Sequence, residues 1–201
     1  MNKHLRYAAV ILAVVVAALS WSCKKDSNNN NNSGGACWGE NWLIGTWEGT
    51  TPSSVTPFAN TKIRIVFNNA VLKYDDQVAG GARKLWAYSG TLTWDVGGAG
   101  QWSMNFSVNN FPAPDYNVII YECMTPNAAT QVVDNISIRV ADTVQVNPWH
   151  SVDLDWGPAI ISTSTPATSF ELYGDIELDF NGNIQRADYV PNESTITMTK
   201  K

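Results

Sequence analysis

The chain has 201 residues, of which 44% are hydrophobic and 15% are charged, and its formal net charge is −5. This composition is ordinary for a globular domain and excludes a disordered chain. An acidic chain without a basic patch is also a poor candidate for binding nucleic acid, so no such partner is expected.

The first 22 residues have the pattern of an export signal. Lys3 and Arg6 precede an apolar run, residues 7–19, which is too short to span a membrane and typical of the core of a signal peptide. Residues 24–36 are polar and rich in asparagine, which predicts a flexible linker. We therefore divide the chain into a signal peptide (1–22), a tether (23–36) and a single all-β domain (37–201).

Cys23 directly follows the apolar run and the small residue Ser22. This arrangement resembles the lipobox of Gram-negative bacterial lipoproteins, with Ser20 in place of the usual aliphatic residue and Trp21 in place of a small one. The resemblance implies cleavage before Cys23, acylation of that cysteine, and a lipid anchor in the outer membrane or at the cell surface. The alternative is that Cys23 merely lies near an ordinary cleavage site.

The chain has three cysteines, and an odd number in an exported protein needs an explanation. If Cys23 carries lipid, Cys37 and Cys123 remain as an even pair. In an oxidising compartment such a pair predicts a disulfide between the start of the domain and its middle. The alternative is two unrelated buried thiols.

The first predicted hairpin lies in residues 63–74. Two apolar runs flank Asn68 and Asn69, and asparagine tolerates the positive φ of a two-residue type I′ turn. This register pairs Phe67 with Ala70.

Period-two alternation in residues 86–94 and 102–108 then predicts two strands with one buried face, joined by a glycine-rich loop. The large side chains on that face either fill a core or line a cavity for a small hydrophobic or amphipathic ligand. These cavity candidates are Trp86, Tyr88, Trp94, Trp102, Met104 and Phe106.

Further strands are predicted in residues 117–123 and 132–147, in a hairpin at 170–190 and in a final strand at 194–200. A three-residue turn at residues 180–182 would pair Ile176 with Arg186 and place Arg186 on the inner face. We find no convincing long helix. About ten strands joined by short connections predict an antiparallel meander that closes as a β-barrel, with a β-sandwich as the alternative.

Gly45 and Trp47 in the first predicted strand resemble the Gly-x-Trp signature of lipocalins and related calycin barrels. In that family the tryptophan packs across the closed end of the barrel, and an arginine from a late strand lies against it. The resemblance implies a lipocalin-like barrel and assigns the arginine's role to Arg186. The alternative is that Arg186 extends to solvent at a barrel rim.

Acidic side chains supply the candidate chemistry. His150, Asp153 and Asp155 could form a metal site, but a solvated strand face also explains the two aspartates. A second acidic set offers the paired carboxylates of a glycoside hydrolase, yet nothing in the sequence indicates the raised pKa that acid catalysis requires. We expect no catalytic residue, metal or cofactor. The second set is Glu171, Asp175, Glu177 and Asp179.

Three functions remain in view. The first is a lipid-anchored, lipocalin-like barrel that binds a small hydrophobic or amphipathic ligand without catalysis. The second is a β-sandwich surface lipoprotein that binds carbohydrate through exposed aromatic residues, and the third is a structural component of the cell envelope. The aromatic candidates for the second function are Trp38, Trp42, Trp149 and Trp156.

Overall fold

The computed structural model describes residues 37–201 except for 79–80, 96–99, 113–116, 127–131, 142–149, 162–164, 181–182 and 192. The predicted signal peptide, Cys23 and the linker lie outside the described residues. By its internal contacts the chain divides into residues 1–32 and residues 33–201, and only the second unit concerns us below. Within the described part, no helix is both long enough and apolar enough to span a membrane.

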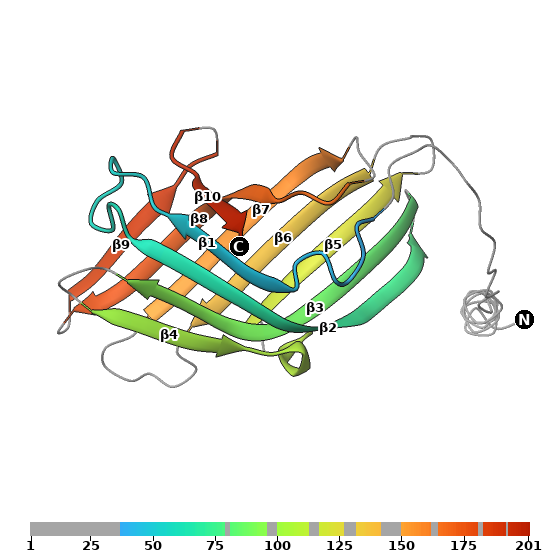
Figure 1. Cartoon of the computed structure of the whole chain (residues 1–201), viewed down its shortest axis with the longest axis horizontal. Coiled ribbons are helices and arrows are strands. Elements are labelled where there is room, and N and C mark those ends of the chain that lie inside the picture. The colour runs from blue at the N-terminus through green and yellow to red at the C-terminus, as the bar shows by residue number, and fades with distance from the viewer. Residues whose placement is uncertain are drawn as a thin grey trace, which may run out of the picture. The chain divides into compact units, whose positions relative to one another are not determined.

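The described residues form ten strands and one short 3-10 helix, η2 (Figure 1). Their bounds are β1 (Gly45–Thr50), β2 (Lys62–Val78), β3 (Gly81–Asp95), β4 (Gln101–Phe106), η2 (Val108–Asn110), β5 (Val118–Pro126), β6 (Val132–Ala141), β7 (His150–Ile161), β8 (Ser169–Phe180), β9 (Asn183–Tyr189) and β10 (Ile196–Lys200).

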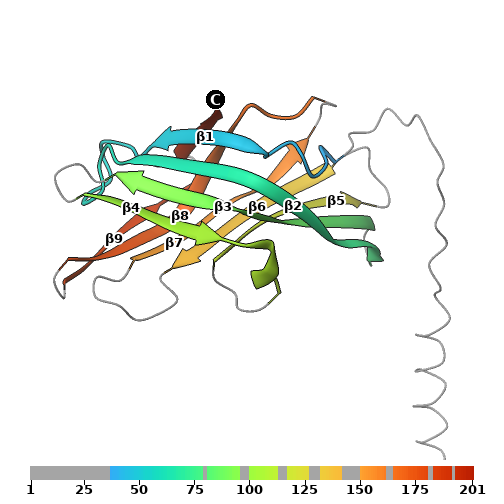
Figure 2. The ribbon, with the colours of Figure 1, turned by 60° about the horizontal axis from the view of Figure 1, so that its bottom comes forward.

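Eight strands pair in a closed antiparallel ring in the order β1-β2-β3-β5-β6-β7-β8-β10, with β10 pairing back onto β1. The predicted lipocalin-like β-barrel is therefore confirmed as an architecture, and the sandwich alternative is wrong. The two other strands extend the wall. Strand β4 follows β5 along one edge of β3, and β9 follows β10 along one edge of β8 (Figure 2).

The predicted hairpin around Asn68 and Asn69 is wrong, because β2 runs through both residues. Phe67 pairs with Gly90 and Asn69 pairs with Ser89, so Asn68 is an extra residue in β2. A β-bulge of this kind keeps the strand continuous and increases its twist. A polar pair between apolar runs suits a bulge as well as a turn, and the partner strand decides between them.

The predicted register of the β8–β9 hairpin is also wrong, by one residue. Ile176 pairs with Ala187, and Glu177 pairs with Arg186. Because a one-residue shift moves every side chain to the other face of the sheet, Arg186 lies on the outer face. There its side chain is 53% exposed, and it forms ion pairs with Asp175, Glu177 and Asp188.

The barrel interior is filled by large side chains. The bulkiest fully buried ones are Trp47, Trp94, Tyr88, Tyr121, Phe58 and Phe67. Packing is tight enough to require a glycine at position 90. A Cβ atom there would lie 1.9 Å from the carbonyl oxygen of Val66 and 2.6 Å from the ring of Phe106. Interiors packed at this density respond to the loss or gain of single methyl groups.

Residues 37–44, which we call the cap segment, pack against the inner face at one end of the barrel. Trp42 is 5% exposed and Leu43 is fully buried. Tyr88 Oη donates to the carbonyl oxygen of Glu40 at 3.0 Å, and Lys200 Nζ donates to that of Trp42 at 2.6 Å. These bonds attach the cap segment to the wall at β3 and β10.

The predicted disulfide is present between Cys37 and Cys123, which joins the cap segment covalently to β5. Cys123 is fully buried, and Cys37 packs against the same core. The beginning of the domain is therefore fixed to the wall at a third strand.

Trp47, at the start of β1, is completely buried, and its Nε1 donates to the carbonyl oxygen of Leu43 at 2.8 Å. The cation against its ring is not Arg186, as the family resemblance implied, but Lys200. Lys200 is the cross-strand partner of Trp47 in β10, and its Nζ lies 5.5 Å from the centre of the indole. The shifted β8–β9 register places Arg186 on the outer face, so the last strand supplies the cation instead.

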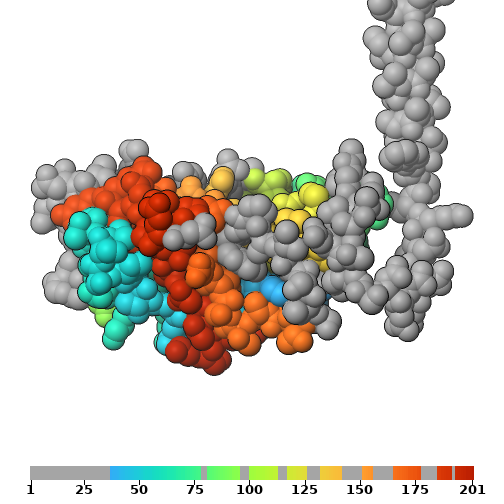
Figure 3. Space-filling model, turned by 90° about the horizontal axis from the view of Figure 1, so that it is seen from above, coloured from blue at the N-terminus to red at the C-terminus, as the bar shows by residue number. Residues whose placement is uncertain are grey.

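Residues 51–61 pack against the other end of the barrel. Phe58 is 1% exposed, and the hydroxyl of Thr51 accepts a hydrogen bond from the backbone nitrogen of Thr61 at 2.8 Å. In Figure 3 this segment (cyan) lies beside the C-terminal strands (red). The hydroxyl of Thr51 thus satisfies a backbone donor within the connection between β1 and β2.

Removing the disulfide should destabilise the domain strongly. We expect the Cys37→Ala/Cys123→Ala variant to lose about 4–5 kcal/mol of unfolding free energy, because the bond closes a loop across a sequence separation of 86. Urea unfolding followed by tryptophan fluorescence measures this loss. Wild-type protein unfolded in the presence of a reductant is the control and should give a similar value, whereas an unchanged midpoint would contradict the prediction.

Removing the Lys200 ammonium group should weaken the capped end. Lys200→Met keeps the apolar stem but loses the charged hydrogen bond to the cap segment and the contact with Trp47, so we expect a loss of about 1–3 kcal/mol. Lys201→Met is the matched control. It removes only an exposed contact with Glu48 at 3.7 Å and should cost less than about 1 kcal/mol. Equal losses in the two variants would show that Lys200 has no special role.

Candidate ligand-binding site

The six predicted cavity residues lie on the inner face, where they pack against one another and against the core. Trp102 is partly buried, and the other five are at most 8% exposed. Trp86 stacks on Tyr121 with 5.3 Å between ring centres and 12° between planes. Phe67 contacts both Tyr88 and Phe106, at 5.4 and 5.6 Å. Of the two alternatives left open by the sequence, filling a core describes these side chains.

Asp134 is the buried polar side chain that our reading of the sequence missed. It lies on the inner face of β6, in phase with Val132, Ile136 and Ile138, and like them it is fully buried. Tyr121 Oη donates a hydrogen bond of 2.6 Å to Asp134 Oδ1. The second oxygen, Oδ2, has no hydrogen-bond partner among the described residues. The sequence does contain a signal for this residue, because an acid that alternates in phase with β-branched core residues is expected to be buried with them.

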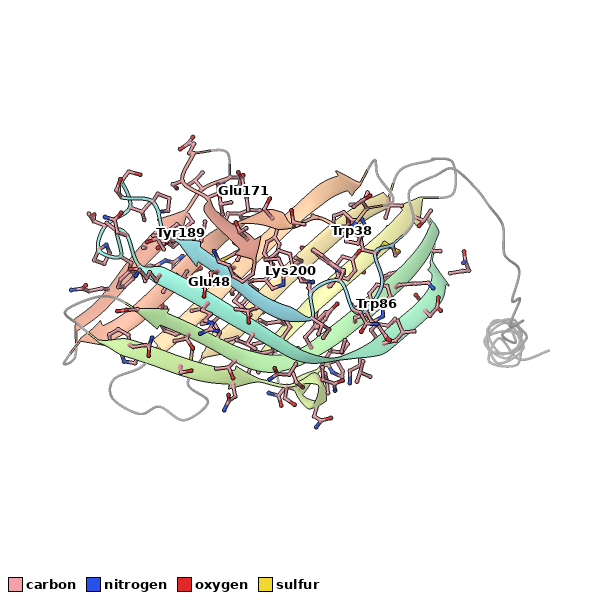
Figure 4. The ribbon with its side chains drawn as sticks, in the orientation of Figure 1. Trp38, Glu48, Trp86, Glu171, Tyr189 and Lys200 are labelled. Carbon is pink, nitrogen blue, oxygen red and sulfur yellow. A yellow bond between two sulfur atoms is a disulfide. The ribbon has the colours of Figure 1, made fainter. Side chains whose placement is uncertain are left out.

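Aromatic rings pack around Tyr121, the hydrogen-bond partner of this carboxyl group, at the capped end of the barrel. Tyr121 stacks on Trp86 and meets Trp42 edge-on at 5.2 Å, and Trp42 contacts Trp38 at 4.7 Å. Figure 4 shows Trp38 and Trp86 at the same end of the barrel. We call Trp38, Trp42, Trp86, Tyr121 and Asp134 the Asp134 cluster. Cys123 is the cross-strand neighbour of Asp134, so the disulfide borders the cluster.

The burial of these groups sets their protonation. Desolvation raises the pKa of Asp134 from its ordinary 3.8 to about 6, although the hydrogen bond from Tyr121 lowers it in part. Desolvation also raises the pKa of Tyr121 far above its ordinary range, and the hydrogen bond to Asp134 adds to this effect. Tyr121 therefore stays protonated and donates, whereas Asp134 changes its charge near neutral pH.

The Asp134 cluster can accept a hydrogen bond and provide apolar contact. It combines one free carboxyl oxygen with the faces of large rings, and it contains no serine, cysteine or lysine nucleophile. Within the described residues, no group of three or more histidine, cysteine or acidic side chains is placed to hold a metal ion. The cluster therefore offers a hydrogen-bond acceptor and an apolar surface, the two kinds of contact that an amphipathic molecule makes.

The described members of the two predicted acidic sets lie on the outer face. Asp153 faces the guanidinium group of Arg139 at 3.6 Å, and Asp175 and Glu177 pair with Arg186. Partial burial raises the pKa of Asp153 and of Asp175, and the neighbouring arginines oppose this shift. The side chains of His150 and Asp179 lie outside the described residues. Asp153, Asp175 and Glu177 are therefore paired with arginines on this strand face.

The aromatic residues proposed for carbohydrate binding divide into two groups. Trp42 is buried and Trp38 is half-buried in the cap segment, so neither offers the exposed ring that this alternative needs. The side chains of Trp149 and Trp156 lie outside the described residues.

The protonation of Asp134 should make stability depend on pH. The unfolded chain titrates near 3.8 and the folded chain near 6, so between these values the folded state binds more protons. The unfolding free energy of the wild type should therefore fall as pH rises from about 4 to about 7, by on the order of 3 kcal/mol relative to Asp134→Asn. Urea unfolding of both proteins across this range measures the difference. Parallel pH profiles would contradict the raised pKa.

Comparisons with known proteins leave the function to be inferred from this geometry. No family model, curated protein or solved structure matches the chain.

Proposed function

We propose that the protein is a non-catalytic binding protein of the bacterial cell envelope. In this proposal Cys23 carries the lipid anchor, and the barrel binds a small amphipathic ligand at the Asp134 cluster. The observation that carries the proposal is the unpaired Oδ2 of Asp134, whose other oxygen is bonded to Tyr121 in a group of packed aromatic rings.

An unpaired oxygen in this position is costly. A buried polar group without a hydrogen-bond partner destabilises a protein by about 1–3 kcal/mol, and buried polar groups in folded proteins are generally paired. A ligand with a hydroxyl or amine group would donate the missing hydrogen bond to Asp134. The rings of Trp86, Trp42 and Tyr121 would contact its apolar body.

Access to the cluster involves the cap segment. The inner face is otherwise filled, and Trp38 is the half-buried member of the cluster, whereas Trp42 and Trp86 are 5% exposed and Tyr121 is fully buried. We therefore assign Trp38 as the side chain that a ligand displaces. The disulfide at Cys37 keeps the cap segment attached to β5 while Trp38 moves.

The anchor rests on the sequence. The lipobox-like pattern at Cys23 supports acylation, and residues 24–36 are a polar stretch that separates the anchor from the barrel. No cofactor is needed for binding of this kind. The barrel would present its ligand site at the outer membrane or cell surface.

The test is a titration of the purified protein with N-phenyl-1-naphthylamine, a hydrophobic fluorescent probe with one N–H donor. We expect saturable binding to the wild type. The Tyr121→Phe/Asp134→Leu variant should bind at least about tenfold more weakly, because it removes the polar end of the site. The same variant should unfold at an equal or higher urea concentration, since replacing both partners of a buried hydrogen bond by apolar groups is close to neutral.

The control variant is Thr91→Val/Asn105→Leu, which removes a hydrogen-bonded pair on the outer face of β3 and β4. It should bind the probe like the wild type. The proposal fails if the wild type shows no saturable binding, or if the Asp134 variant binds with unchanged affinity. Loss of stability together with binding would instead indicate that Asp134 has only a structural role.

A further inference from the structure

The outer face of β5 to β8 is hollowed into a groove. A hollow of about 450 Å³ lies over these four strands, and a smaller one of about 170 Å³ lies between them and the segment after η2. Ser137 and Arg139 line both hollows, so the two adjoin. The residues that matter below are Phe111, Asn135, Ser137, Arg139, Asp155 and Tyr173.

Hydrogen-bonding groups occupy the middle of the groove. Ser137 donates a hydrogen bond to Asp155, its cross-strand neighbour, and the amide of Asn135 lies two residues away on the same face of β6. Arg139 lies in the next row, paired with Asp153 at 3.6 Å. Hydrogen-bond donors and acceptors of neighbouring side chains on β6 and β7 therefore lie close together in the groove.

Apolar side chains lie at both ends of the groove. Tyr173 pairs with Asp155 across β7 and β8 and lines the larger hollow. Phe111 lines the smaller one, together with Ile120, and packs against the small outer cluster of Ala87, Val108 and Val118. A ligand that reaches across the groove would meet an aromatic ring at each end.

We infer that this groove binds a short oligosaccharide. A sugar hydroxyl both donates and accepts, and the groove places a guanidinium group, an amide, a hydroxyl and a carboxylate side by side. A pyranose ring also has an apolar C–H face that packs on an aromatic side chain. Tyr173 and Phe111 supply such surfaces.

A peptide strand suits the groove less well. Extended peptides bind by adding a strand to an open sheet edge, where main-chain groups are free. Here β6 pairs with β5 and β7 on its two edges, so the groove offers side chains on a sheet face. The same pairing holds the polar groups in place before a ligand arrives, which lowers the entropic cost of binding.

The groove is independent of the Asp134 cluster. The two sites use opposite faces of β6, because Asp134 points inward and Asn135 and Ser137 are only partly buried on the outer side. The Tyr121→Phe/Asp134→Leu variant should therefore bind sugars normally, and either proposal can fail without the other.

The test is isothermal titration of the full chain, purified in detergent, with maltohexaose, laminarihexaose and chitohexaose. We expect at least one of these to bind saturably. Tyr173→Ala should weaken that binding by about tenfold or more, and Tyr173→Phe should retain most of it because the ring remains. Circular dichroism shows whether each variant is folded.

Arg139→Ala and Arg64→Ala form a matched pair. Each removes an exposed arginine with one carboxylate 3.6 Å away, but only Arg139 lines the groove. Arg139→Ala should weaken sugar binding, and Arg64→Ala should not. The inference is overturned if none of the three sugars binds, or if Tyr173→Ala and Arg139→Ala are both folded and bind sugar like the wild type. It is also overturned if a hexapeptide binds to the groove and the sugars do not.

Discussion

Closure of the ring by β10 is the constraint on which the other features of the domain depend. This strand has five residues, and it pairs with β1 along one edge and with β8 along the other. Without it both neighbours would expose an open edge, and the inner face could not be sealed from water. Its pairing with β1 also places Lys200 beside Trp47, so the strand that closes the wall holds the cap segment as well.

The fold class followed from the sequence because alternation reports directly on burial. Period-two patterns identified inner faces correctly at Trp86, Tyr88 and Trp94, and the count of strands required a closed or stacked sheet. Register did not follow, because it also depends on the length of each turn. A three-residue turn at residues 180–182 would pair Ile176 with Arg186, whereas Phe180 pairs with Asn183 and Ile176 with Ala187, which turns Arg186 outward. The two asparagines at 68 and 69 fit a turn as well as a bulge, and only the pairing of β2 with β3 decides between them.

The candidate sites were harder to predict for a related reason. Asp134 interrupts the apolar inner face of β6, but its meaning depends on Tyr121, which alternation cannot pair with it across the β5–β6 register. The outer groove depends on rows of side chains that run across four strands. Which side chains are neighbours across the strands depends on every register. The sequence of a single strand therefore does not predict that Ser137 lies next to Arg139 and Asp155.

The disulfide determines which strand of the barrel bears a force applied to the N-terminal end of the domain. Tension from the chain before residue 37 passes through Cys37 to Cys123 and into β5, whose two edges pair with β3 and β6. The load therefore falls on strands held along their length and bypasses the few hydrogen bonds of residues 38–44. In the lipid-anchored form that we propose, a pull through residues 23–36 would therefore reach β5 without breaking the contacts of the cap segment, and reduction of the disulfide would direct the same force onto the cap segment.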